Sequence, residues 1–147
     1  MDAELRHVLE AAFPGEETRY FTPMSIGSTP SDAGAGAAAI LNGTKTTTSS
    51  PFWDYPDGKI PFVGALSILL DGQGQARAIV ETERVEIMPF GSVDEAFARA
   101  YGEGDRTLEW WRSEIGAWYR ESATRHNEDF SDDTLIIGEW IAVVRRL

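Results

Sequence analysis

The sequence contains no cysteine and only two histidines, His7 and His126, among its 147 residues. Disulfides and thiol catalysis are therefore excluded, and cytoplasmic localisation is expected. Most zinc sites are excluded as well, because zinc prefers sulfur and imidazole ligands. We expect no cofactor. A divalent metal stays an alternative, because the side chains of Asp129, Asp132 and Asp133 offer oxygen ligands. These residues lack the spacing of a calcium-binding loop, so a solvated turn is the favoured interpretation.

Long apolar runs are also absent, and basic residues are few. No stretch approaches the roughly 20 apolar residues that cross a bilayer, so no membrane partner is expected. The acidic, mixed N-terminus does not resemble a secretory signal. With 13 Lys and Arg against 24 Asp and Glu, the net charge is −11. This charge opposes binding to long duplex nucleic acid and favours a small ligand in a local pocket. The oligomeric state stays open.

The apolar residues that are present predict one packed domain with helices and strands. They make up 42% of the chain, which is enough for one core. Helical spacing predicts helices over 2–13, 31–41, 93–101 and 107–126. Strand patterns cover 20–26, 66–70, 78–87 and 135–144, with a hairpin turn at Asp71-Gly72. This order predicts an α+β fold with a small, mostly antiparallel sheet or barrel.

Start signals refine three of the predicted helices. Asp2 can cap the first helix, and Ser31 or Asp32 can cap the second. The run Ser92-Val93-Asp94-Glu95 has the form of a capping box, with Ser92 as the N-cap.

The stretch Asn42–Ser50 stands out because it surrounds Lys45 with threonines and serines. It lacks the apolar rows of a packed helix, and we expect that it cannot serve as a strand buried on both faces. A lysine amine among hydroxyls is either a solvated turn or a site that holds something polar. From the residues alone, the solvated lysine is the favoured interpretation.

From about Ile26 to its end, the chain resembles the ASCH domain family, named after homology to the activating signal cointegrator. The motif Gly43-Thr44-Lys45-Thr46-Thr47-Thr48 is similar to the family's Gly-x-Lys-x-x-Thr. Further similar blocks follow in the same order: Trp53-Asp54-Tyr55, Leu70-Asp71-Gly72, Val85–Phe90 and Gly102–Leu108. The resemblance implies a PUA-like, mostly antiparallel β-barrel with helices packed around it. It assigns residues 26–147 to the domain and 1–25 to an N-terminal helix and connecting segment.

The resemblance also implies candidate activities. Similar proteins include an amidohydrolase that removes the acetyl group of N4-acetylcytidine, which would make Lys45 the base, Thr48 the nucleophile and Glu103 the third catalytic group. Asp105 is an alternative to Glu103, although a helix-capping role fits Asp105 equally well. Other relatives cleave or bind single-stranded RNA. A non-catalytic module for a small ligand is the third possibility.

The substrate-binding candidates lie around the same blocks. They are Thr46, Ser49, Trp53, Tyr55, Asp105 and Arg106. Trp53 and Tyr55 could stack on a nucleobase, an interaction of about 1–3 kcal/mol per base, or could equally belong to the core. Arg106 could meet a phosphate, although an ion pair with an acidic residue is the commoner role. The expected partner is a nucleoside or a short single-stranded RNA segment.

Overall fold

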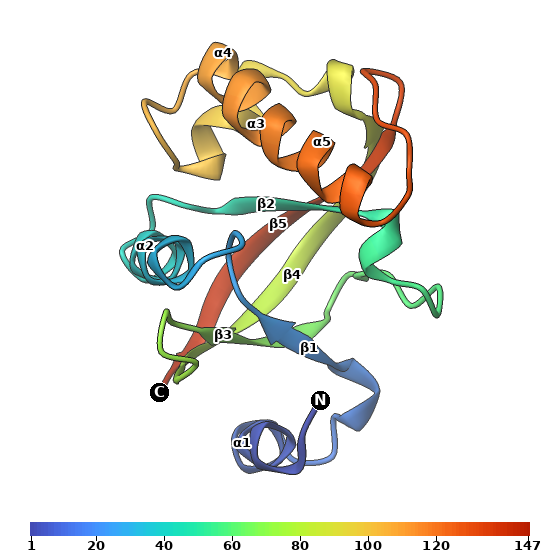
Figure 1. The fold of residues 1–147 in the computed structure, drawn as a ribbon. Coiled ribbons are helices and arrows are strands. Elements are labelled where there is room, and N and C mark those ends of the chain that lie inside the picture. Colours follow the sequence, from blue (N-terminus) through green and yellow to red (C-terminus); the bar gives the residue numbers. More distant parts are fainter.

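A five-stranded sheet forms the centre of the computed structural model, which describes residues 1–147 (Figure 1). Its strands follow the order β1-β3-β4-β5-β2. Their bounds are β1 Tyr20–Met24, β2 Thr47–Pro51, β3 Leu66–Leu70, β4 Ala76–Pro89 and β5 Leu135–Arg146. Only β1 and β3 are parallel, and the other pairs are antiparallel. The predicted α+β fold and its mostly antiparallel sheet are therefore confirmed.

The sheet is open, so the predicted β-barrel is not confirmed. β1 and β2 are the outer strands, and each pairs with one neighbour only. They lie at opposite ends of the long antiparallel pair β4–β5 (Figure 1). β2 pairs with the first half of β5, whereas β1 pairs with β3, which pairs with the first half of β4. Irregular register in the β4–β5 ladder, between Ile79 and Val80 and between Thr82 and Arg84, adds local bending.

Five α-helical segments accompany the sheet. They are α1 Ala3–Ala12, α2 Pro30–Leu41, α3 Glu95–Tyr101, α4 Leu108–Trp110 and α5 Gly116–Arg125. The predicted helix over 107–126 is present, but a π-helical turn over Trp111–Ile115 joins α4 to α5. No helix combines the length and the apolar character that a bilayer crossing requires.

Two of the predicted helix caps were wrong. Thr29 caps α2, with Pro30 at the start of the helix, instead of Ser31 or Asp32. A proline has a fixed φ that suits the first helical position, so Pro30 begins the helix and the cap lies two residues upstream of Ser31. Asp94, not Ser92, caps α3, because Phe90–Ser92 forms a separate 3₁₀ turn. Asp2 caps α1 as predicted.

The helices cover both faces of the sheet. On one face, Leu9 of α1 packs in a fully buried cluster with Leu66, Ile68 and Ile79. On the other face, α2 covers a cluster that includes Leu69, Val80 and Ile141. A third cluster, centred on Trp111 and Tyr119, lies between the α3–α5 segment and the sheet. The segment over 1–25 thus contributes both a helix and strand β1 to the structure formed with residues 26–147.

The burial of Leu9 generates a stability prediction. Leu9→Ala should lower the free energy of unfolding by about 2–5 kcal/mol, because it leaves a cavity between α1 and the sheet. Urea unfolding followed by circular dichroism measures this change. The exposed His7 of the same helix is the control, and His7→Ala should change stability by no more than about 0.5 kcal/mol. Equal, small effects of both variants would show that α1 is not part of the cooperative core.

Candidate functional site

The stretch after α2 forms the edge strand β2, and its side chains are buried on both faces. The expectation that this run could not be such a strand was therefore wrong. Its hydroxyls are hydrogen-bonded: Thr47 Oγ1 donates to the Phe97 carbonyl at 3.1 Å, and Tyr119 donates to Ser49 Oγ at 3.0 Å. Tyr55 donates to Ser50 Oγ at 3.0 Å. These hydrogen bonds replace those to water, so the burial of the polar side chains of β2 costs little free energy.

Lys45 lies just before β2 and is almost completely buried, with 1% of its surface exposed. Its Nζ donates to Glu103 Oε2 at 2.8 Å and to the Tyr101 carbonyl at 3.1 Å. The amine also lies 3.4 Å from the centroid of the Tyr101 ring. Burial lowers the pKa of Lys45 from 10.5 to about 8, and the charge of Glu103 opposes part of that shift.

The loop Gly102-Glu103-Gly104 brings Glu103 to Lys45. Gly102 has a φ of +68°, and a Cβ there would lie 2.4 Å from the Thr44 carbonyl oxygen. Gly104 has a φ of +61°, and a Cβ there would enter the Trp110 ring. Gly102 therefore allows the loop to pass directly against the backbone before β2, and Gly104 allows it to pass against the Trp110 ring. Glu103 remains partly exposed, so its carboxylate contacts both the buried amine and the cavity described next.

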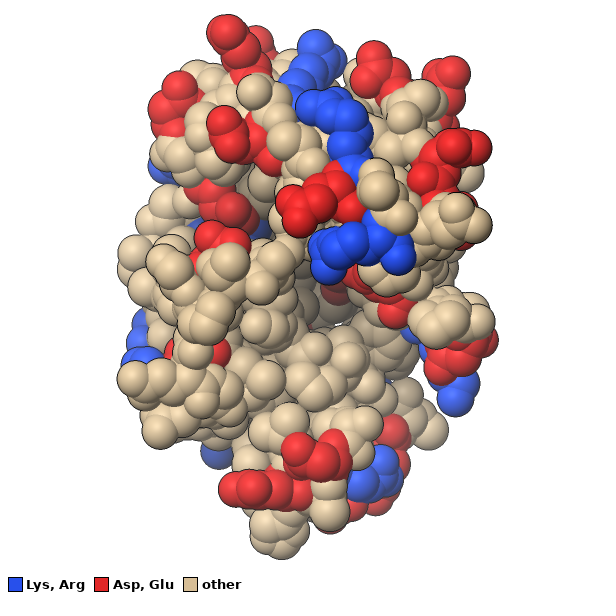
Figure 2. All heavy atoms as spheres, viewed as in Figure 1, with Lys and Arg blue, Asp and Glu red and all other residues tan.

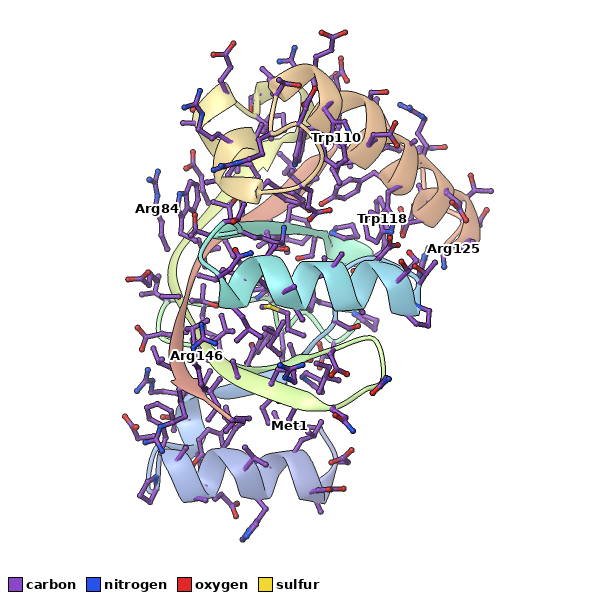
Figure 3. The ribbon with its side chains drawn as sticks, turned by 90° about the vertical axis from the view of Figure 1, so that its left-hand side faces the viewer. Met1, Arg84, Trp110, Trp118, Arg125 and Arg146 are labelled. Carbon is purple, nitrogen blue, oxygen red and sulfur yellow. The ribbon has the colours of Figure 1, made fainter.

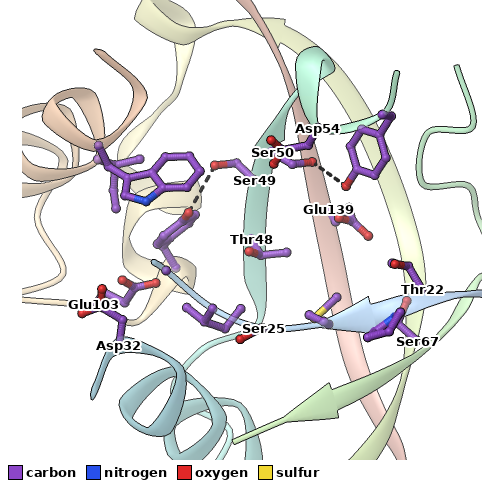
Figure 4. A pocket seen from close by; sticks show the side chains of 18 of the residues that line it. Thr22, Ser25, Asp32, Thr48, Ser49, Ser50, Asp54, Ser67, Glu103 and Glu139 are labelled. Atoms are coloured by element: carbon purple, nitrogen blue, oxygen red, sulfur yellow. Dashed lines mark hydrogen bonds between the residues drawn. The ribbon is translucent and has the colours of Figure 1, made fainter. Parts of the chain in front are cut away.

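A cavity of about 580 Å³ opens beside this ion pair, and Figure 4 shows it from close by. Both outer strands, β1 and β2, line it, so it occupies the side on which the sheet fails to close. Its lining has five carboxylate side chains and no Lys or Arg. The five are Asp32, Asp54, Glu103, Glu114 and Glu139. Figure 2 shows a hollow between the upper helices and the lower part of the molecule.

Aromatic side chains frame the cavity. Trp110 and Trp118 come from the α4–α5 segment, and Trp118 lies on the side of this segment that faces α2 (Figure 3). The Trp118 indole donates to Ser28 Oγ at 2.6 Å and thereby links α5 to the loop before α2. Tyr55 lies opposite with Phe21, at a ring-centroid distance of 6.0 Å. Burial raises the pKa of Tyr55 to about 12, so its hydroxyl stays protonated at neutral pH.

Four of the predicted site residues line this cavity: Thr48, Ser49, Tyr55 and Glu103. Lys45 does not line the cavity, but its amine donates a hydrogen bond to Glu103, which does. No hydrogen bond joins the Lys45 amine to the Thr48 hydroxyl. The Tyr101 hydroxyl lies near both Thr48 and Ser49, and burial raises its pKa well above the ordinary value despite these hydrogen bonds.

The other predicted site residues lie outside the cavity. Thr46 is exposed, and its backbone pairs with Ala100 and Ile141. Trp53 packs edge-on against Tyr119, and its indole donates to Ser122 Oγ at 2.9 Å. Asp105 accepts hydrogen bonds from the backbone and the hydroxyl of Thr107, but Thr107 itself caps α4, so the helix-capping role expected of Asp105 was wrong. Arg106 donates to the Arg99 carbonyl. Of the two acidic candidates, only Glu103 reaches Lys45.

Sequence reasoning missed Ser67 and Glu139, which also line the cavity and are 1% and 4% exposed. Burial raises the pKa of Glu139, and a hydrogen bond from Thr82 opposes the shift. Each residue is a polar position inside an otherwise apolar strand, Leu66–Leu70 or Ile136–Ile141. A polar residue within an apolar strand was the signal in the sequence by which both residues could have been found. No group of three or more His, Asp or Glu side chains lies close enough together to hold a metal ion.

The lowered pKa of Lys45 predicts how stability depends on pH. Above pH 8 the folded protein releases the Lys45 proton, while the unfolded chain keeps it up to about pH 10. The unfolded state then binds more protons, so the contribution of Lys45 to the free energy of unfolding should rise with pH. The slope should approach about 1.4 kcal/mol per pH unit in this window.

The measurement is urea unfolding of the wild type and of Lys45→Met between about pH 7 and pH 10. The wild-type value minus the variant value should increase with pH, because tyrosine titration occurs in both proteins and cancels. Lys59→Met removes the other, exposed lysine and serves as the matched control. A difference that stays flat above pH 8 for Lys45→Met would contradict the burial argument.

The sequence and the fold are similar to those of known proteins. The ASCH domain family matches residues 22–145. The crystal structure of an ASCH domain from Lactobacillus crispatus JV V101 is similar with a TM-score of 0.83 and 24% identity, over 97% of this chain and 92% of that one. Protein EF3133 from Enterococcus faecalis V583 is similar with a TM-score of 0.82 and 26% identity, over 99% and 91%. No curated protein matches the chain significantly. Because the family match spans most of its length, the chain belongs to the ASCH domain family.

Proposed function

We propose that the cavity binds an uncharged nucleoside and that the protein hydrolyses an amide on its base, as in N4-acetylcytidine. The observation that carries this proposal is the lining, with five carboxylates, several hydroxyls and no basic side chain. Such a surface offers hydrogen bonds to hydroxyl and amino groups and repels phosphate. The volume of about 580 Å³ lies within the ordinary range of small-molecule pockets.

The aromatic frame supports a planar ligand. Trp110, Trp118 and Tyr55 line the cavity from different parts of the chain. A nucleobase can stack on such rings whatever its sequence context, because every base has a π-face. The ribose hydroxyls would then meet carboxylate acceptors. A single-stranded RNA segment would also bring its phosphates, for which the lining has no cationic partner.

In the proposed reaction, Thr48 Oγ attacks the carbonyl carbon of the acetyl group, and its proton passes through Glu103 to the Lys45 amine. Glu103 contacts both the cavity and that amine, so it serves as the proton carrier. The C–N bond then breaks, the cytidine nitrogen takes the same proton back from Lys45 through Glu103, and an acyl-threonine ester remains. Water hydrolyses this ester to acetate and free Thr48. The lowered pKa of Lys45 provides the neutral amine that a base requires.

Binding is the first test. Cytidine should bind at least about tenfold more tightly than cytidine 5′-monophosphate, because the acidic lining repels the phosphate. Isothermal titration calorimetry measures both affinities, and the difference should shrink as salt screens the repulsion. Tighter binding of the monophosphate, or of a short single-stranded RNA, would overturn the proposal and favour the RNA alternative.

Turnover of N4-acetylcytidine, followed by chromatography, tests the chemistry. Thr48→Val keeps the shape of the side chain without its hydroxyl and should reduce turnover more than about a hundredfold. Glu103→Gln should reduce it in the same range, because the proton carrier is lost. The control is Thr124→Val, an exposed threonine outside the cavity that should leave turnover unchanged.

The pH dependence is a separate outcome of the same assay. The value of kcat/KM should fall about tenfold for each pH unit below pH 8, because only the neutral Lys45 amine accepts the proton. A profile that is flat from pH 6 to pH 9, about three units, would contradict a lysine base. Nucleoside binding without any turnover would leave a non-catalytic binding module. Cleavage of a fluorescent single-stranded RNA that disappears in Thr48→Val would support the ribonuclease alternative.

A further inference from the structure

One face of the sheet changes from apolar to polar along three neighbouring strands. Under α2 this face presents Leu69, Val80 and Ile141. Two residues further along each strand, and therefore on the same face, stand Ser67, Thr82 and Glu139. Thr22 of β1 and Thr48 of β2 continue this arrangement on the outer strands and line the cavity. We call Thr22, Ser67, Thr82, Glu139 and Thr48 the polar row.

The hydrogen bonds of the polar row are incomplete at two positions. Ser67 Oγ is buried and has no hydrogen-bond partner. Thr82 Oγ1 donates to Glu139 Oε1 at 2.9 Å, whereas the second carboxylate oxygen of Glu139 makes no hydrogen bond. A buried polar group without a partner lowers stability, so such groups are uncommon in the interior of a sheet. Ser67 Oγ is such a group, and it lines the cavity together with Glu139, whose second oxygen is free, which indicates that a ligand completes their hydrogen bonds.

The two incomplete groups lie at the end of the cavity that the Lys45–Glu103 pair does not occupy. In Figure 4, Glu139 stands between Thr48 on one side and Thr22 with Ser67 on the other. The strand register agrees, because Glu139 is paired with Thr48 across β5 and β2. Directly paired residues in an antiparallel ladder have Cβ atoms about 5 Å apart. A ligand atom bound to Glu139 is therefore next to the Thr48 hydroxyl.

We propose that Glu139 and Ser67 read the edge of the nucleobase, with Glu139 accepting from an exocyclic amino group and Ser67 donating to the adjacent ring nitrogen. Cytosine carries this pair of groups side by side, as an amino group next to a ring acceptor. In an N4-acetylated base, the remaining amide N–H is the donor to Glu139. That contact places the acetyl group beside Thr48. The inference rests on the proposed nucleoside function and names the specificity of the same cavity.

The test compares cytidine with zebularine, the analogue in which hydrogen replaces the 4-amino group and the ring nitrogen is kept. The wild type should bind cytidine about tenfold more tightly, because zebularine leaves Glu139 without its donor. Glu139→Met has no acceptor, so its preference for cytidine should shrink to less than about threefold. Glu121→Gln, at an exposed position of α5, should keep the full preference.

Ser67→Ala distinguishes ligand recognition from a structural role. The variant should weaken cytidine and zebularine equally, by about tenfold, because both keep the ring nitrogen. It should also raise the urea midpoint of the ligand-free protein, since it removes a buried hydroxyl that has no partner. Ser113→Ala changes an exposed serine outside the cavity and should alter neither quantity.

The outcomes separate the two proposals. If the wild type binds neither nucleoside, both the proposed function and this inference are overturned. If the wild type binds cytidine but Glu139→Met keeps the preference, only the reading of the base edge is overturned. Ser67→Ala that raises the urea midpoint without weakening either ligand would also overturn it. Glu139→Met must show the wild-type circular dichroism spectrum, and if it does not fold, the Ser67→Ala comparison decides.

Discussion

The ion pair between Lys45 and Glu103 connects two parts of the chain that are far apart in sequence. Lys45 follows the end of α2 and precedes β2, while Glu103 stands in the loop after α3. The Lys45 side chain is fully buried, so its charge needs the carboxylate and the Tyr101 carbonyl. Losing one partner of such a pair leaves an uncompensated charge in the interior, which is strongly destabilising. The position of β2 against α3, and with it one wall of the cavity, depends on this contact.

The open sheet and the polar cavity have a common physical basis. A barrel would close only if β1 paired with β2, but the side chains of both strands line the cavity instead. The polar row runs across the sheet at this place, whereas the neighbouring part of the same face, at Leu69, Val80 and Ile141, is apolar and covered by α2. A row of hydroxyls and a carboxylate cannot pack against an apolar layer without losing hydrogen bonds. The same residues therefore keep this side of the sheet free of an apolar cover and present polar side chains to the cavity.

The accuracy of the predictions from sequence differed between elements of the fold. The helix over 2–13 and the strand over 66–70 were predicted well, because their periodicity and their turn residues are encoded locally. The caps of α2 and α3 were displaced by neighbouring residues, namely Pro30 and the 3₁₀ turn at Phe90–Ser92. The run Thr47–Pro51 looked too polar for a buried strand, since its hydroxyls find their partners on α3, α5 and the Tyr55 loop. Those partners are invisible in a local pattern.

By itself, the sequence determined what chemistry is available. It excluded thiols and most zinc ligands, and it marked Lys45 and its hydroxyl neighbours as the unusual stretch of the chain. Through resemblance it also named Glu103, but it left Asp105 as an alternative. Only the tertiary structure decided which acid meets the amine, 58 residues away along the chain. It also brought Ser67 and Glu139 into the cavity and moved Trp53 out of it. Such choices depend on strand order and register, which the packing of distant segments determines and local periodicity does not.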